Sequence, residues 1–169
     1  MQRDIVEAFS LKSENMTSEG LRAFWTFDDE IKKKYKAGGL DRQHSPEQKL
    51  TALVQAYESF YHDDFRKQYL GHYFRHLYHI YKLIDTSETF SSKEKLQYAK
   101  IVRAQLSHLE LKLLFLNCCS EDGKAFQQYV GRYELLEWFD DEEFDNYDTE
   151  FRTSSIIKET IASWRPSDA

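Results

Sequence analysis

The sequence is poor in the residues that interrupt helices or cross-link a chain. Its 169 residues include 2 prolines and 6 glycines, which argues against a β architecture with many turns. The two cysteines, Cys118 and Cys119, are adjacent, so on a helix their side chains would point about 100° apart and could not bridge each other. They also lack the C-x-x-C spacing of redox and zinc motifs. We therefore predict two buried free thiols in a reducing compartment.

Long apolar runs and an excess of positive charge are also missing from the sequence. No stretch approaches the roughly 20 apolar residues that span a bilayer, and residues 1–4 do not lead into the apolar core of a signal peptide. These observations predict a cytoplasmic protein without a membrane span. The formal net charge of −6 disfavours non-specific binding to nucleic-acid backbones, because such binding requires a positive surface.

Apolar residues instead recur at steps of three and four, which is the spacing of helices and not of strands. Ser45-Pro46-Glu47 predicts a helix start, because it combines a capping serine, a proline at the first helical position and an acid in the first turn. The pattern then continues without a proline, which predicts one long helix at about 46–84. A helix of that length would be unusual, so a kink or break is expected near Asp63-Asp64 or Gly71.

A second start signal, Ser91-x-x-Glu94, has the spacing of a capping box. It precedes a predicted central helix at about 92–119, whose apolar face repeats every three or four residues from Ala99 to Leu116. Together these patterns predict an all-α fold, an up-and-down helical bundle of about four to six helices.

The remaining segments complete a single-domain organisation. Gly38-Gly39 ends a predicted helix at about 19–36, and further helices are predicted at about 124–138 and 154–164. The acidic residues between positions 140 and 148 are expected to form a solvated loop. The predicted organisation has three parts: an N-terminal segment (1–18), a helical core domain (19–139), and an acidic loop with a C-terminal segment (140–169).

Two dense sequence blocks within this core carry a family resemblance. The first, at 69–84, runs from Tyr69 through three histidines and an arginine to Ile80. The second, at 98–117, contains the run from Tyr98 to Ser107 and then Glu110, Leu113-Leu114-Phe115 and Asn117. In this order the blocks resemble the signature blocks of the putative phage abortive-infection (AbiC-like) family.

The resemblance implies a bacterial protein that limits phage infection, often by harming or halting the infected cell. Many relatives look membrane-anchored through N-terminal spans, which adds a second expectation: the chain is the soluble part of a membrane-anchored protein. The family name supplies no reaction, and no cofactor is predicted.

The two blocks also hold a concentrated set of polar side chains. Three histidines of the first block share one helix face at i, i+4 and i+7: His72, His76 and His79. On the second block, Arg103, Ser107 and Glu110 share a face in the same way. If the two helices are antiparallel neighbours, a polar site forms between them. The candidate functional residues are Arg75, His76, His79, Arg103, Gln105, Glu110 and Asn117.

A structural and a metal-binding interpretation both fit these residues. In the first, Glu110 forms an ion pair with Arg103 or Arg75, and the histidine and tyrosine tips hydrogen-bond in a partly buried network. In the second, two histidines at zinc-compatible spacing are joined by a third ligand, either a histidine or Glu110. The candidate metal ligands are His72, His76 and His79. No motif such as H-E-x-x-H accompanies them, so no metal is assigned.

A third interpretation is a metal-independent ribonuclease. Arg103 stands five residues before His108, which resembles the Arg-x4-His spacing of HEPN ribonucleases, small helical bundles that are frequent in phage defence. In such a site the arginine stabilises phosphate charge and the histidine moves a proton from the 2′-hydroxyl. That family usually has a polar residue directly after the arginine, where this chain has Ala104. About 140° separates the two side chains on one helix, so a helix end or a second subunit would have to bring them together.

The aromatic content supports a fourth interpretation, an interaction module. The chain has 12 Phe, 11 Tyr and 3 Trp, and the tyrosines between 57 and 81 cannot all face one core. Surplus aromatics favour a homodimer or a contact with a phage or host protein, whereas RNA is a partner only under the ribonuclease hypothesis. The leading hypothesis is an anti-phage sensing or toxic-effector domain with its polar site where the 69–84 and 98–117 helices meet. The HEPN-like ribonuclease is the alternative.

Overall fold

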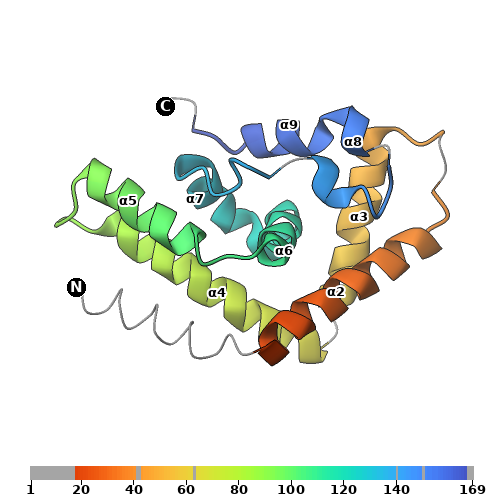
Figure 1. Cartoon of the computed structure of the whole chain (residues 1–169), viewed down its shortest axis with the longest axis horizontal. Helices are drawn as coiled ribbons and strands as arrows, with labels where there is room; N and C mark the ends of the chain where they lie inside the picture. The colour runs from red at the N-terminus through yellow and green to blue at the C-terminus, as the bar shows by residue number, and fades with distance from the viewer. Residues whose placement is uncertain (1–17, 41–42, 63, 140, 150, 167–169) are drawn as a thin grey trace.

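The computed structural model describes residues 18–40, 43–62, 64–139, 141–149 and 151–166 (Figure 1). Apart from residue 18, the predicted N-terminal segment lies outside the described residues. Within these ranges the chain forms α-helices and two 3-10 helices and contains no strand, so the predicted all-α helical fold is confirmed. The helices α2 to α9 are more numerous than the four to six predicted, because predicted helices are divided.

The first described helices begin and end where the sequence signals lie. α2 (Ser18–Ala37) matches the helix predicted at about 19–36. It is followed by Gly39, whose φ of 69° lies in the left-handed region that glycine adopts without strain. α3 (Pro46–Tyr61) begins with a capping box: the N–H of Gln48 donates to the Ser45 hydroxyl, and the Gln48 side chain accepts from the Ser45 N–H.

The long helix predicted at 46–84 is two helices, α3 and α4 (Asp64–Thr86). α3 closes at His62, whose N–H donates to the Glu58 carbonyl, and α4 leaves it at a steep angle (Figure 1). The division falls at Asp63-Asp64, one of the two positions where the sequence predicts a break. The helix dipole favours an acid in the first turn, so this aspartate pair suits a new helix start better than a helix interior.

The single helix predicted at 92–119 is wrong, because the chain turns between α5 (Ser92–Arg103) and α6 (His108–Cys119). The reason is a second capping box. The N–H of Glu110 donates to the Ser107 hydroxyl at 3.3 Å, and a Glu110 carboxylate oxygen accepts from the Ser107 N–H at 2.8 Å. These bonds satisfy amides at the start of α6 that would otherwise lack partners, so a new helix begins inside the apolar pattern.

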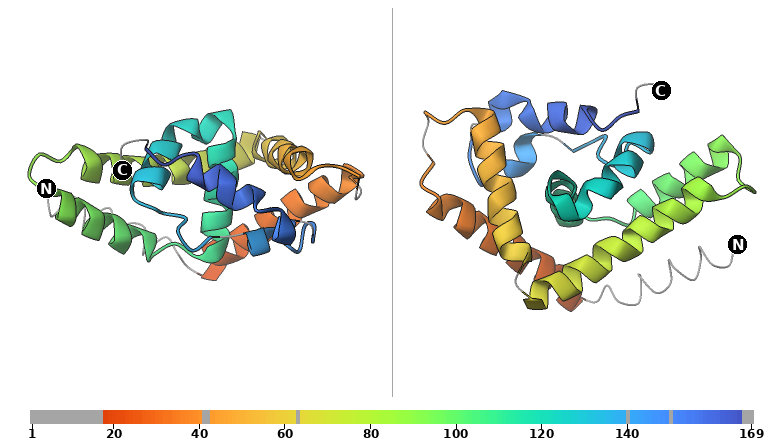
Figure 2. Two further views of the ribbon diagram at one scale, coloured as in Figure 1. Left: turned by 90° about the horizontal axis from the view of Figure 1, so that it is seen from above. Right: turned by 180° about the vertical axis from the view of Figure 1, so that it is seen from behind.

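α6 is the centre of the fold. Figure 1 shows it nearly end-on, surrounded by α2, α3, α4 and α7, and it stays enclosed in both views of Figure 2. Residues 110–118 are all buried, so the helix is covered around almost its whole circumference and not along one stripe. The up-and-down order holds for α4 and α5, which lie side by side in opposite directions, whereas α6 crosses them.

The segment after α6 is less regular than the helix predicted at 124–138. It forms η1 (Glu121–Phe126), a short α7 (Gln127–Arg132) and then a series of turns. Close packing fixes this segment, since a Cβ added to Gly131 would lie 1.9 Å from the backbone oxygen of Trp164. The last described elements are η2 (Asp141–Phe144), α8 (Phe151–Ser154) and α9 (Ile156–Ala162). α9 lies within the range of the short last helix predicted at 154–164.

The acidic segment is not a solvated loop, which corrects the prediction for residues 140–148. Phe144, Tyr147 and Phe151 belong to the buried core together with α6 residues. Asp148 forms an ion pair with Lys49, which is itself 1% exposed. Aromatic residues interspersed among the acids therefore bring this segment onto the bundle, and burial of their rings outweighs the solvation of their neighbours.

Both thiols are free, and Cys118 is fully buried while Cys119 is half-buried. Burial raises the pKa of Cys118 well above its usual range and raises the pKa of Cys119 to about 12. Both thiols therefore stay protonated near neutral pH and behave as small apolar side chains. None of the helices in the described ranges combines the length and the apolar character needed to cross a bilayer.

Candidate functional site

The histidines predicted as a metal group lie on the outer side of α4. The rings of His72 and His76 are stacked with centroids 6.5 Å apart, and the exposed His79 contacts the edge of Tyr78. Across the described ranges, no three His, Cys, Asp or Glu side chains come together as a metal-binding group. Glu110, the other proposed third ligand, is buried elsewhere and already holds two hydrogen-bonded partners.

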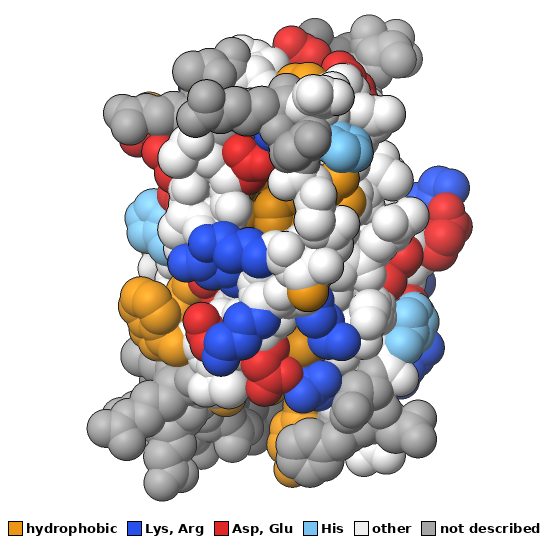
Figure 3. All heavy atoms as spheres, turned by 90° about the vertical axis from the view of Figure 1, so that its right-hand side faces the viewer, with side chains coloured by type: hydrophobic (Ala, Val, Ile, Leu, Met, Phe, Trp, Pro, Cys, Tyr) orange, Lys and Arg blue, Asp and Glu red, His pale blue; other side chains and the backbone are white. Residues whose placement is uncertain are grey.

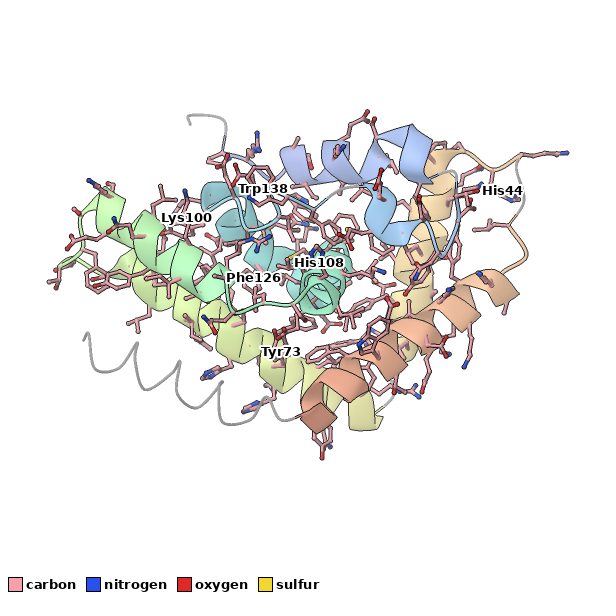
Figure 4. All side chains as sticks on the ribbon, viewed as in Figure 1. His44, Tyr73, Lys100, His108, Phe126 and Trp138 are labelled. Carbon is pink, nitrogen blue, oxygen red and sulfur yellow. The ribbon has the colours of Figure 1, made fainter. Side chains whose placement is uncertain are left out.

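Glu110 is a structural residue of the α6 start, and its carboxylate hydrogen-bonds with Ser107 and Tyr73 and pairs with neither Arg75 nor Arg103. One carboxylate oxygen closes the Ser107 capping box, and the other accepts from the Tyr73 hydroxyl at 2.5 Å. Figure 4 shows Tyr73 on α4 beneath α6. Burial and the adjacent Glu110 carboxylate raise the pKa of Tyr73 well above its usual range. The predicted ion pairs of Glu110 with Arg75 and Arg103 are wrong, because each arginine uses a backbone carbonyl instead.

Arg103, Gln105 and His108 lie along the turn between α5 and α6 and do not converge. The Arg103 Nε donates to the Leu135 carbonyl at 3.2 Å, and the Gln105 side chain is exposed. His108 is exposed at the first position of α6, with its Nδ1 2.9 Å from a carboxylate oxygen of Glu143. The spacing that resembles the ribonuclease motif therefore spans a helix break, and its two residues contact different segments.

Arg75 and Asn117, one candidate from each sequence block, line the same pocket. This pocket has a volume of about 170 Å³ and lies between α4, the end of α6 and η1, with Tyr61 of α3 at its edge. Its lining residues are Tyr61, Gly71, Phe74, Arg75, Tyr78, Asn117, Asp122, Gly123, Ala125 and Phe126. The structure thus brings together two of the seven predicted residues, and it adds an aromatic wall that the sequence did not indicate.

The floor of the pocket is built by a close approach of η1 to α6. The Asn117 side chain is 3% exposed, and its Nδ2 donates to the Tyr57 hydroxyl at 3.1 Å. A Cβ on Gly123 would lie 2.1 Å from the backbone oxygen of Asn117, so only glycine allows this approach. The amide of Asn117 is therefore held between the Tyr57 hydroxyl and η1.

Two side chains with hydrogen-bond donors, Tyr61 and Arg75, line the pocket next to Gly71. A Cβ on Gly71 would lie 2.9 Å from the Tyr61 hydroxyl, and the Gly71 carbonyl accepts from the Arg75 Nε at 3.0 Å. The pKa of Tyr61 is raised by burial and by the charge of Asp122, and the charge of Arg75 opposes this rise. The hydroxyl and the guanidinium thus belong to one lining, and the charge of Arg75 acts on Tyr61.

Asp122 supplies a negative charge at the pocket rim. Its carboxylate oxygens lie 3.4 Å from the His62 Nε2 and 3.6 Å from the Lys67 Nζ. The ammonium of Lys67 also lies 5.9 Å from the centre of the Tyr61 ring. The Asp122 side chain is 32% exposed and its two partners about half exposed, so these pairs are screened and contribute little to stability.

A group of buried charges that the sequence did not indicate lies where α6 meets α2 and α3. Lys112 of α6 lies 3.4 Å from Asp28 of α2, with both side chains 6% exposed. The Tyr147 hydroxyl donates to the same Asp28 carboxylate at 2.9 Å. Lys49 and Asp148 form the neighbouring pair at 3.0 Å. Each charge here meets an opposite charge, as buried charges require, so the group holds helices together and offers no open site.

A second hollow of about 440 Å³ lies between the turns after α7 and α9. Trp138, at its edge, is 76% exposed and is labelled in Figure 4. None of the seven predicted site residues lines this hollow. Its rim carries charges of both signs, among them Glu134 and Arg165, whose side chains lie 3.6 Å apart.

The face shown in Figure 3 carries charges of both signs. Figure 3 views the side formed by the ends of α2 and α3, where lysine, arginine, aspartate and glutamate side chains are interspersed.

Comparison with known proteins gives one match. No curated protein and no solved structure matches the chain. A family model described as putative phage abortive infection protein matches residues 66–144, a little less than half of the chain. This segment holds every residue that lines the pocket except Tyr61. The match confirms the resemblance predicted from the two blocks: residues 66–144 are similar to the putative phage abortive infection protein family.

Proposed function

We propose that the chain acts in abortive infection as a sensing or toxic-effector domain, and that its functional surface is the pocket between α4, α6 and η1. The observation that supports this is the position of Arg75 and Asn117. They come from separate sequence blocks that resemble the family, and both line the same cavity within the matched segment. A shared binding site is the simplest explanation for polar residues from both blocks, Arg75 and Asn117, in one cavity.

The chemistry of the pocket favours binding over bond cleavage. Its wall is aromatic, and Tyr61 and Arg75 point hydrogen-bond donors into it. A hydrolytic site would need a nucleophile beside a base of suitable pKa, and the lining of this pocket lacks that combination. The domain would therefore sense a ligand, from a phage or host source, and pass the signal through α4 or α6. A second copy of the chain is a further proposed partner.

The test is phage plating on bacteria that express the chain with Arg75→Gln, which removes the charge but keeps much of the side-chain length. We expect protection against phage to fall to the level of cells without the protein. Gln105→Ala is the matched control, because Gln105 is an exposed polar residue of the second block outside the pocket. Urea unfolding of both variants separates loss of function from loss of fold. Full protection by Arg75→Gln would contradict the proposal.

The same phage-plating assay separates the pocket hypothesis from the ribonuclease alternative. Under that hypothesis, His108→Ala should abolish both protection and chelator-insensitive RNA degradation, while Arg75→Gln should leave both unchanged. Under the pocket hypothesis, the exposed His108 should tolerate replacement and Arg75 should not.

A further inference from the structure

We infer that the pocket between α4, α6 and η1 takes a small ligand that presents one carboxylate to Tyr61 and Arg75 and an apolar body to the aromatic wall. This inference rests on the proposed function, because it names the ligand of the same site. It is carried by two donors without protein partners, by the composition of the wall and by the charge at the rim.

The first observation is the Tyr61 hydroxyl. Tyr61 is 5% exposed, yet its hydroxyl makes no hydrogen bond to any residue in the part of the chain that the structure describes. The hydroxyl oxygen is not a fully buried atom, so it meets the space of the pocket and not a closed interior. The hydroxyl of Tyr57, on the same helix, is instead paired with the Asn117 side chain. The Tyr61 hydroxyl is thus placed to donate to a ligand oxygen.

The second observation is the guanidinium of Arg75. Its Nε is fixed on the Gly71 carbonyl, whereas its two Nη groups have no acceptor among the described residues. A guanidinium anchored at one edge presents its remaining N–H groups in a fixed plane, which matches the two oxygens of a carboxylate. Anchoring also lowers the side-chain entropy that a ligand would have to restrict.

The wall and the rim select the rest of the ligand. Phe74, Tyr78 and Phe126 form an apolar surface opposite the donors, and a pocket of about 170 Å³ holds a body of about one aromatic side chain. Lys67, 3.6 Å away, offsets part of the Asp122 charge at the rim. The remaining negative charge repels a phosphate dianion more than a singly charged carboxylate.

A carboxylate with a compact apolar body has two sources. One is a free aliphatic or aromatic acid. The other is the C-terminal carboxylate of a protein whose last residue is apolar. Both present the same chemistry to Tyr61 and Arg75, so they are separated by experiment.

The test is a titration of the ¹⁵N-labelled chain with 3-phenylpropionate, followed by the backbone amide signals of Gly71, Asn117 and Gly123. We expect these signals to move with 3-phenylpropionate and to stay in place with its neutral amide. Tyr61→Phe, which removes only the hydroxyl, should weaken binding about tenfold or more, the usual effect of losing a hydrogen bond to a charged group. Tyr98→Phe is the matched control, since the half-buried Tyr98 packs on Phe90 outside the pocket and should bind as the unchanged chain does.

Three results would overturn the inference: equal binding of the acid and its amide, equal binding by Tyr61→Phe, or tighter binding of inorganic phosphate. A tripeptide ending in phenylalanine, compared with its C-terminal amide, identifies the source. Tighter binding of the tripeptide acid than of 3-phenylpropionate indicates a protein terminus, and the reverse indicates a free acid. Binding and phage protection are separate measurements. If Arg75→Gln loses protection but the chain binds no carboxylate, the proposed ligand is rejected and the site is kept. If the chain binds the carboxylate but Arg75→Gln still protects, the proposed role in defence is rejected and the ligand is kept.

Discussion

The two sides of α6 use polar side chains in opposite ways. On the side of α2 and α3, Lys112 and Asp28 meet at 3.4 Å and the Tyr147 hydroxyl completes the group. On the side of η1, the donors of Tyr61 and Arg75 face a cavity. Polar groups that satisfy one another fix a fold, whereas converging donors without partners leave binding energy for a ligand. The two sides therefore differ in how their charges are paired: the pairs of Lys112 and Lys49 are closed and buried, whereas Arg75 lies at an open pocket.

The largest expected effect comes from breaking the closed side. Lys112→Ala should lower the free energy of unfolding by about 3–5 kcal/mol, because it leaves the Asp28 carboxylate buried without its cation. The measurement is urea unfolding followed by circular dichroism. Lys124→Ala is the control, since Lys124 pairs with Glu121 at 3.2 Å on an exposed surface and its loss should change little. Equal unfolding midpoints for the two variants would show that the charged group does not hold the fold together.

A smaller loss of stability is expected at the start of α6, between its two sides. Glu110→Ala removes the capping box of α6 and the acceptor of the Tyr73 hydroxyl, so it should cost about 2–3 kcal/mol. Glu94→Ala removes the equivalent residue from the exposed capping box of α5 and serves as the control. Glu94→Ala should lower the free energy of unfolding clearly less, because water replaces the missing acceptor at this exposed position. Similar losses in both variants would mean that burial adds nothing to the α6 cap.

Helix starts were predictable wherever a capping residue preceded a new apolar run. Ser45 and Ser91 begin α3 and α5 as their patterns indicate. The Ser107-x-x-Glu110 pattern carries the same signal, yet it was interpreted as part of one polar face. The cause is Leu106, which is buried in the turn and keeps the apolar spacing intact across the helix break. Periodicity reports burial, and a buried turn can have the spacing of a helix.

The site was predictable only in the part that the two blocks supply. Arg75 and Asn117 were found because polar residues concentrate in those blocks, but Tyr61 and Asp122 come from α3 and η1. Their approach depends on tertiary packing. The glycine at position 123 was a usable signal, because a glycine that admits a backbone neighbour is needed where elements approach closely. Ion pairs such as Lys49 with Asp148 join positions far apart in the sequence, so no local sequence pattern predicts them.

A loss of stability of intermediate size is expected when the pocket floor is changed. Gly123→Ala places a methyl group 2.1 Å from the Asn117 backbone oxygen, so it should cost about 1–3 kcal/mol through overpacking. Thermal unfolding monitored by circular dichroism gives the value. Unchanged stability would mean that η1 can move away from α6 and that the floor is not rigid.

The smallest effect on stability, and the sharpest test of whether the pocket is the functional surface, is expected for Tyr61→Phe. Because no described residue bonds to this hydroxyl, its removal should change the free energy of unfolding by less than about 0.5 kcal/mol. If the pocket is the functional surface, phage plating on cells that express this variant should nevertheless show protection sharply reduced relative to the unchanged chain and to Tyr98→Phe. Full protection by a stable Tyr61→Phe protein would contradict the account.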